Sequence, residues 1–142
     1  MENCFELAQM IPPFDHHGVL PPGLHPATLA EVGERFGGQS EIRRVQIESV
    51  RWMVDLALRA GVKKIVLNGS FVTDIIEPND VDCVLLFEGI APRDRVAFRE
   101  LRKGLPFLDI AIVRMRGFEE YVHAVFAVDR TGTPKGMVEV VA

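Results

Sequence analysis

The chain has 142 residues, of which 48% are hydrophobic and 25% are charged, so its composition is that of a folded domain and argues against a disordered chain. Its length suits one compact domain and leaves no room for a second. The formal net charge of −4 and the pI near 5.6 give the surface as a whole no long-range attraction for a polyanion, so duplex DNA is not expected as a partner.

The cysteine and hydropathy patterns indicate the cellular environment. Cys4 and Cys83 are the only cysteines, a pattern that fits neither a disulfide framework nor a zinc site. The apolar runs are far shorter than the roughly 20 residues of a membrane helix, and no charged leader precedes an apolar stretch. We therefore expect a soluble, cytoplasmic protein in a reducing compartment, with no membrane partner.

The N-terminal part is rich in proline and glycine. Residues 11–26 read IPPFDHHGVLPPGLHP, and no regular element is expected to run through them. We predict a proline-rich arm over residues 1–27 and one domain over residues 28–142. The arm also carries apolar side chains, so we expect it to pack on the domain as a strap. These side chains belong to Ile11, Phe14, Val19, Leu20 and Leu24.

Two helices are predicted next. Thr28 and Glu31 form a capping-box pattern at the start of a helix over about residues 28–36. A longer helix starts near Ser40 and ends at Gly61, because glycine suits the position just after a helix. Its buried stripe is expected to contain Ile42, Val45, Val50, Met53 or Val54, and Ala57 or Leu58.

Four apolar, β-branched runs are predicted as strands, over residues 64–68, 81–87, 108–113 and 137–141. Between the second and third, residues 92–103 are predicted as a helix with Val96, Phe98 and Leu101 on its apolar face, so these two strands should be parallel. The apolar residues of the segment 118–128 fit the spacing of a helix and that of a strand, and we favour a helix. The predicted fold class is α/β (α+β), a small mixed sheet of about four strands with helices packed on it.

Residues suited to binding phosphate and metal lie between the first two predicted strands. Gly69 and Ser70 end the first strand, where a missing side chain and free N–H groups suit a phosphate. Asp80 and Asp82 stand two residues apart at the start of the next strand, so both carboxylates lie on one face and suit Mg²⁺. Each feature also has a simpler structural explanation. Gly69 and Ser70 could form an ordinary tight turn, and Asp80 and Asp82 could be solvent-exposed residues at the start of a strand.

A third acidic residue, Asp109, stands alone in the apolar run 108–113. A carboxylate among such residues is costly to bury unless it is paired, hydrogen-bonded or bound to a metal. If this strand lies beside the strand of Asp82, the three acids form one cluster. The alternative is an exposed carboxylate at the end of a strand.

The order of these features resembles the core of the nucleotidyltransferase superfamily related to DNA polymerase β. The resemblance implies that Gly69 and Ser70 hold a nucleoside triphosphate and that Asp80, Asp82 and Asp109 hold two Mg²⁺ ions and carry catalysis. The segments Pro12–Phe14, Gly18–Gly23, Gly69–Thr73 and Pro78–Asp82 are also similar to small prokaryotic nucleotidyltransferase-like proteins.

The chain departs from the superfamily pattern after Ser70. Minimal antitoxin-type members carry an arginine close to the phosphates, whereas this chain continues with Phe71, Val72 and Thr73. We include Thr73 among the nucleotide-binding candidates, and Arg130 and Lys135 as cations that replace the missing arginine. Charged turn residues exposed to water are the alternative.

The expected function is Mg²⁺-dependent transfer of a nucleoside monophosphate from a triphosphate to an acceptor hydroxyl of a protein, an RNA or a small molecule. The alternative is an inactive, antitoxin-like module that binds a nucleotide or a protein partner, and a hydrolase is a third possibility. A homodimer is plausible, because a small sheet has edge strands.

Several other residues have structural explanations. His16 and His17 lack a third ligand at metal-binding spacing and are read as part of the arm. Cys83 is predicted to be a small buried hydrophobe, and Trp52 and Phe36 are predicted to lie in the core. Arg43 and Arg44 are read as surface charges on a solvated helix face.

Overall fold

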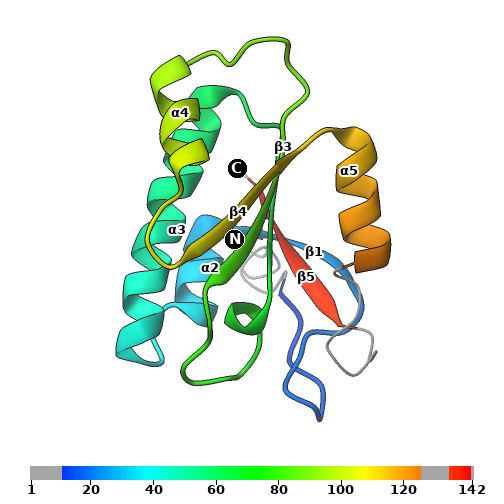
Figure 1. The fold of residues 1–142 in the computed structure, drawn as a ribbon. Helices are drawn as coiled ribbons and strands as arrows, with labels where there is room; N and C mark the ends of the chain where they lie inside the picture. Colours follow the sequence, from blue (N-terminus) through cyan, green and yellow to red (C-terminus); the bar gives the residue numbers. More distant parts are fainter. Residues whose placement is uncertain (1–10, 126–134, 142) are drawn as a thin grey trace, which may run out of the picture.

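The computed structural model describes residues 11–125 and 135–141, which form a mixed α+β fold around a five-stranded sheet (Figure 1). The strands are Gly23–Thr28 (β1), Lys64–Asn68 (β2), Val81–Leu86 (β3), Leu108–Val113 (β4) and Gly136–Val141 (β5). Their order is β1-β5-β2-β3-β4. β1 is parallel to β5 and β3 is parallel to β4, whereas β2 is antiparallel to both β5 and β3.

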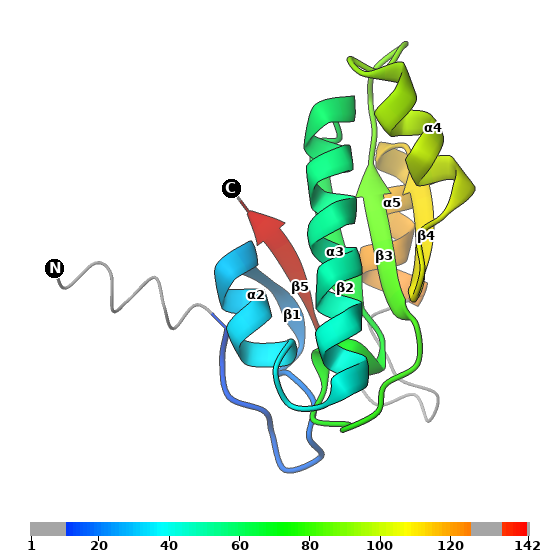
Figure 2. The same ribbon diagram turned by 90° about the vertical axis from the view of Figure 1, so that its left-hand side faces the viewer.

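Helices cover both faces of this sheet. Leu29–Phe36 (α2), Glu41–Ala60 (α3) and Arg95–Lys103 (α4) lie on one face, and Met115–Glu120 (α5) lies on the other (Figures 1 and 2). A π-helical turn, Tyr121–Val125 (η2), continues α5, and a 3₁₀ turn, Ser70–Val72 (η1), follows β2. No helix within the described residues is long and apolar enough to cross a membrane.

The central strands are apolar on both faces because each face packs on helices. On the α3 side, alternate residues such as Ile65, Leu67 and Leu85 join the larger core. On the α5 side, Val66 and Val84 join a smaller cluster around Phe118. This two-sided burial explains why β2 and β3 read as continuous apolar runs.

The helix ends follow the predicted caps. Thr28 accepts a hydrogen bond from Glu31 N and the Glu31 side chain accepts one from Thr28 N, so the predicted capping box is confirmed. Ser40 caps α3, and Gly61 ends it with φ +91°, in the left-handed region that glycine adopts readily. Both helices occupy the predicted ranges.

The prediction of no regular element in residues 11–26 was wrong at its C-terminal end. β1 starts at Gly23 and pairs with β5 over its whole length, so the sheet has one strand more than predicted and begins before residue 28. Pro26 is compatible with this strand because β1 is an edge strand and needs hydrogen bonds on one side only.

The remaining part of the arm lies against α2. Leu20 is fully buried and the Phe14 ring packs 6.1 Å from the Phe36 ring. Arg35 donates hydrogen bonds to the carbonyls of Ile11 and Pro12 and stacks on Phe14. The apolar and cationic contacts together anchor this segment.

Some predicted core residues are exposed. Phe36 is buried, as predicted, but Trp52 is 49% exposed, and Val45 and Leu58 also lie largely in water. The buried stripe of α3 is rotated about the helix axis from the predicted one. It includes polar side chains, which the spacing of apolar residues cannot reveal. The buried residues are Arg43, Gln46, Ile47, Ser49, Val50, Met53, Val54, Leu56, Ala57 and Ala60.

The helix between β3 and β4 starts later than predicted. Asp94 caps α4 by accepting a hydrogen bond from Ala97 N, and the first helical residue is Arg95. Ala97 and Leu101 face the core, whereas Val96 is 61% exposed. The predicted parallel pairing of the flanking strands is confirmed.

The C-terminal elements agree with the predictions within the described residues. α5 and η2 are helical through Val125, and the rest of the predicted helix over residues 118–128 lies outside the described residues. The final strand, β5, starts one residue before the predicted range.

Candidate functional site

An open cleft of about 1020 Å³ lies at the end of β2 and at the starts of β3 and β4. The loop between β2 and β3 and the first turns of α3 form its walls. Seven of the predicted site residues line it, namely Gly69, Ser70, Thr73, Asp80, Asp82, Asp109 and Lys135. Arg130, the eighth, lies outside the described residues.

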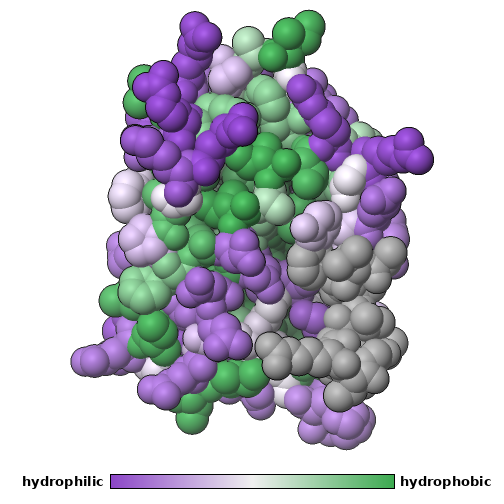
Figure 3. Space-filling model, viewed as in Figure 1, coloured by the Kyte–Doolittle hydropathy of each residue, from purple (hydrophilic) through white to green (hydrophobic). Residues whose placement is uncertain are grey.

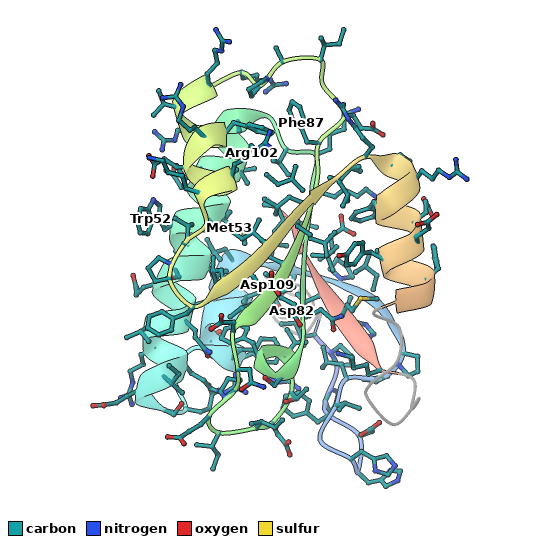
Figure 4. All side chains as sticks on the ribbon, viewed as in Figure 1. Trp52, Met53, Asp82, Phe87, Arg102 and Asp109 are labelled. Carbon is teal, nitrogen blue, oxygen red and sulfur yellow. The ribbon has the colours of Figure 1, made fainter. Side chains whose placement is uncertain are left out.

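Strand pairing places three polar residues in one row across the sheet. Asn68 is directly opposite Asp82, and Asp82 is directly opposite Asp109. Residues opposite one another on neighbouring strands point to the same face, so these three side chains are neighbours. Figure 4 shows Asp82 and Asp109 next to each other on β3 and β4.

The three residues differ in burial. Asn68 is fully buried, Asp82 is half-buried, and Asp109 is exposed because β4 is an edge strand. Asp80 lies just before β3 and is exposed. The cleft therefore grades from a buried polar floor to an acidic, solvent-accessible rim.

The surroundings of Asp82 disfavour its negative charge. Burial raises the pKa of Asp82, and the nearby carboxylates of Asp109 and Asp80 raise it further, while Lys135 lowers it. An added cation next to Asp82 would favour the ionised carboxylate. The electrostatics of this cleft thus suit a positively charged ligand.

The turn after β2 requires glycine. Gly69 has φ +83°, and a Cβ at this position would lie 2.6 Å from Oδ2 of Asp82. The main chain therefore passes directly beside the carboxylate. In η1 the Val72 N–H donates to the Gly69 carbonyl at 3.2 Å, whereas the N–H groups of Ser70 and Phe71 have no acceptor within this turn.

Ser70 retains a free hydrogen-bond donor. Its Oγ accepts a hydrogen bond of 2.9 Å from Asn79 N, which ties the two ends of the loop together. The hydroxyl hydrogen has no acceptor among the residues that the structure describes. Ser70 can therefore donate to an anion in the cleft.

Thr73 has a different environment. Its hydroxyl donates to the Ser70 carbonyl at 2.6 Å and accepts from Ile75 N at 3.2 Å. These bonds hold the loop in shape. A direct contact between Thr73 and a nucleotide stays a prediction.

Lys135 stands at the floor of the cleft. Its Nζ donates a hydrogen bond of 2.8 Å to Oδ1 of Asn68, and its charge acts on Asp82. This position, directly before β5, brings a cation from the C-terminal part of the chain to the acidic row. Lys135 is thus placed beside the predicted phosphate and metal residues.

A buried arginine supports the loop, and the sequence interpretation of Arg43 as a surface charge was wrong. Arg43 is 2% exposed and donates hydrogen bonds to the carbonyls of Phe36, Phe71, Thr73 and Ile75. Burial lowers the pKa of Arg43, and the carboxylate of Asp74 partly opposes this. The position could have been found, because Arg43 falls on the buried stripe of α3 at helical spacing from Ile47 and Val50.

Gln46 is a second polar residue that the sequence analysis missed. Its Nε2 donates to the carbonyls of Asn79 at 2.8 Å and Pro78 at 3.2 Å, so it fixes the chain just before Asp80. Its Oε1 is buried and has no partner among the described residues. A buried glutamine one turn after Arg43 gave no distinct sequence signal.

The other singled-out residues have minor roles in the site. His17 lines the cleft, and its exposed ring contacts that of His16 in a tilted arrangement. Cys83 faces away from Asp82 and is 1% exposed, as predicted, and burial raises the pKa of its thiol. A buried thiol of this kind is not a nucleophile.

The donor set of the cleft fits a hard cation. Carboxylate oxygens are the ligands that Mg²⁺ prefers, together with waters and phosphate oxygens. Within residues 11–125 and 135–141, no three acidic, histidine or cysteine side chains converge into a complete metal ligand set. The exposed carboxylates of Asp80 and Asp109 offer oxygen ligands of this kind at the rim of the cleft.

The sequence was compared with known proteins. It matches the profile of a family described as a family of unknown function (DUF6932) over residues 12–141. No curated protein and no solved structure gave a significant match. Because the match spans nearly the whole chain, the protein belongs to this family.

Proposed function

We propose that this member of the DUF6932 family is a Mg²⁺-dependent nucleotidyltransferase, which moves a nucleoside monophosphate from a nucleoside triphosphate to an acceptor hydroxyl. The observation that carries the proposal is the row of Asn68, Asp82 and Asp109 beside the turn at Gly69. Acidic groups for a cation and main-chain donors for phosphate lie in one cleft. The proposal includes the fold: the five-stranded sheet with its helices is taken to be nucleotidyltransferase-like.

In this proposal Asp80, Asp82 and Asp109 hold the metal ions. The raised pKa of Asp82 fits this role, because a neighbouring cation offsets the burial and the adjacent negative charges. Two bound Mg²⁺ ions would supply charge stabilisation for the attacking and leaving oxygens.

The phosphate chain is assigned to the turn after β2. The Ser70 hydroxyl and the N–H groups at the start of η1 donate to phosphate oxygens, and Gly69 lets the main chain approach them closely. Lys135, which donates a hydrogen bond to Asn68 in the same cleft, supplies positive charge to these oxygens. These groups orient the triphosphate before reaction.

The acceptor is assigned to the open side of the cleft. Asp109 lies on the edge strand and is exposed, so an incoming hydroxyl reaches it without displacing other side chains. As a carboxylate it accepts a hydrogen bond from this hydroxyl and orients the oxygen for attack. The acceptor itself is a protein, an RNA or a small molecule.

The experiment is isothermal titration of the protein with ATP, GTP, CTP and UTP, each with and without Mg²⁺. The Asp80→Asn, Asp82→Asn double variant tests the acidic pair, and Asp55→Asn, an exposed carboxylate on α3, is the matched control. We expect saturable, Mg²⁺-dependent binding that the double variant loses and the control keeps. No binding of any triphosphate would sink the proposal and favour the inactive, antitoxin-like module.

A second measurement tests turnover. Incubation with the bound triphosphate and Mg²⁺ should release pyrophosphate and leave the nucleoside monophosphate on an acceptor. Release of free monophosphate would instead identify water as the acceptor and a hydrolase as the activity.

A further inference from the structure

A second concave region, which we call the β4 hollow, lies beside the edge of the sheet, away from the acidic cleft. It has a volume of about 530 Å³ and lies between α4, the upper part of β4 and the segment that follows β3. Figure 3 shows hydrophobic side chains gathered there, with hydrophilic ones on both flanks. Its lining is Phe87, Ile90, Pro92, Phe98, Leu101, Arg102, Ile110, Ile112, Val113 and Arg114.

The hollow adjoins an unpaired strand edge. Among the residues that the structure describes, β4 is the last strand of the sheet and pairs with β3 only. The Phe107 carbonyl accepts a hydrogen bond from Val81 N in β3, and the Val113 carbonyl accepts one from Phe87 N just after β3. The alternate residues, Ile110 and Ile112, therefore direct their N–H and C=O groups outward. An exposed edge with free backbone groups is a template for another strand.

The sequence of β4 lacks most of the features that block such pairing. The strand reads LDIAIV, without proline, glycine or lysine, and Asp109 at its start is its only charge. The opposite edge, β1, carries Gly23 and Pro26. In natural sheets, edge strands that are not used for pairing carry features that prevent it. The largely unprotected edge of β4 therefore indicates a binding surface.

The two charged residues that line the hollow, Arg102 and Arg114, are both basic, although the chain as a whole is acidic. Between residues 93 and 103 five residues are basic and two are acidic, against a net charge of −4 for the chain. Arg95, Arg99 and Arg102 form no ion pair with any described residue. Arg114, on the other rim, donates to the Gly89 carbonyl at 2.7 Å and stacks on Phe87.

We propose that the β4 hollow binds an extended segment of a partner protein, which adds as a strand to β4. The segment carries branched apolar side chains at alternate positions, which enter the hollow, and acidic residues, which meet Arg102 and Arg114. Backbone bonds to Ile110 and Ile112 provide affinity and the apolar and basic lining provides selectivity.

Charge decides between this partner and a second copy of the chain. A second copy would offer the hollow its own β4, in which the single carboxylate of Asp109 is offset by the Arg114 that follows the strand, so it brings no net negative charge to the two arginines of the lining. An acidic segment meets the same arginines with opposite charge. The acidic peptide is therefore the occupant that the surface fits.

The test uses a displayed library of random peptides, selected on the full chain. We expect enrichment of peptides that alternate Val or Ile with other residues and contain Asp or Glu. The strongest peptide is then synthesised in three forms: unchanged, with Lys in place of its acids, and with N-methylated peptide bonds. The two altered peptides should bind at least about tenfold more weakly, because each loses one class of contact.

Variants of the chain locate the site. Arg102→Glu should weaken the unchanged peptide about tenfold and improve the Lys-containing one, and Ile112→Pro should weaken both, since it removes an outward N–H. Arg116→Glu and Leu58→Lys, which change exposed residues elsewhere, are controls without effect. Circular dichroism confirms that each variant is folded.

Three results would overturn the proposal. One is the absence of any enriched peptide. Another is an enriched peptide whose affinity is unchanged both by Arg102→Glu and by N-methylation. The third is a dimer in solution, seen by light scattering, that Ile112→Pro dissociates, because a second copy then covers β4. None of these outcomes bears on triphosphate binding in the cleft.

Discussion

The acidic cleft and the β4 hollow lie along the same two strands, β3 and β4, but they are built from different interactions. The cleft depends on a few polar contacts between distant segments, above all those that Arg43 and Gln46 make to the loop before Asp80. The hollow is a surface of apolar side chains whose Arg102 has no ionic partner among the described residues. Single changes should therefore damage the cleft far more than the hollow.

The largest effect is expected for Arg43→Met. The substitution keeps much of the buried volume but leaves several carbonyls of residues 36–75 without a donor, so the free energy of unfolding should fall by about 3 kcal/mol or more. Urea denaturation measures it. The control is Arg44→Met, where an exposed side chain is lost and about 0.5 kcal/mol or less is expected. Equal effects of the two variants would contradict the comparison.

Gly69→Ala should have the next largest effect. Gly69 and Gly104 both have positive φ, so alanine strains the backbone at both, by about 1 kcal/mol. Only at Gly69 does the new Cβ also meet a carboxylate, that of Asp82, while nothing lies within 4 Å at Gly104. The loss of unfolding free energy for Gly69→Ala should exceed that for Gly104→Ala by about 1–2 kcal/mol. A smaller loss at Gly69 would show that the loop can move away from β3.

Asp82→Asn should stabilise the fold near neutral pH. The pKa of Asp82 is raised in the folded state, so the folded protein binds this proton more tightly than the unfolded chain does. The ionised carboxylate therefore costs stability above its folded pKa, and this cost disappears as the pH falls below the ordinary value of 3.8. Urea denaturation from pH 7 to pH 3 should show an advantage of the variant that shrinks with acid. A variant less stable than the wild type at pH 7 would disprove this.

The smallest effect on stability is expected in the hollow. Arg102→Glu alters an exposed side chain that is in no ion pair with a described residue, so the free energy of unfolding should change by less than about 0.5 kcal/mol. The same urea measurement applies. A loss above 1 kcal/mol would mean that Arg102 supports the packing of α4 and would weaken the contrast with the cleft.

The local elements were predictable because their signals are local. Thr28, Ser40 and Gly61 act on backbone groups within a few residues, and the helices α2 and α3 begin and end where these residues stand. The central strands were found from apolar runs that burial on both faces requires. β1 was missed because Gly23 and Pro26 oppose strand formation, and β5 provides the pairing that overrides them.

Burial was harder to predict than secondary structure. Trp52 is half exposed, while the charged Arg43, about two and a half helical turns away on the other side of α3, is buried. Hydrophobicity ranks these two residues in the opposite order. What reverses it is the set of carbonyls at Phe36, Phe71 and Thr73 that the loop presents to the guanidinium.

The residue pattern alone therefore specified the helix caps, the apolar strands and the local pair of Asp80 and Asp82, since each depends on neighbours in the chain. Strand pairing decided that Asn68, Asp82 and Asp109 share one row, and that Lys135 reaches it from a distant segment. Tertiary packing also placed the buried donors of Arg43 behind the loop. Contacts between residues far apart in sequence depend on the joint packing of all the elements, and no short stretch of sequence contains that information.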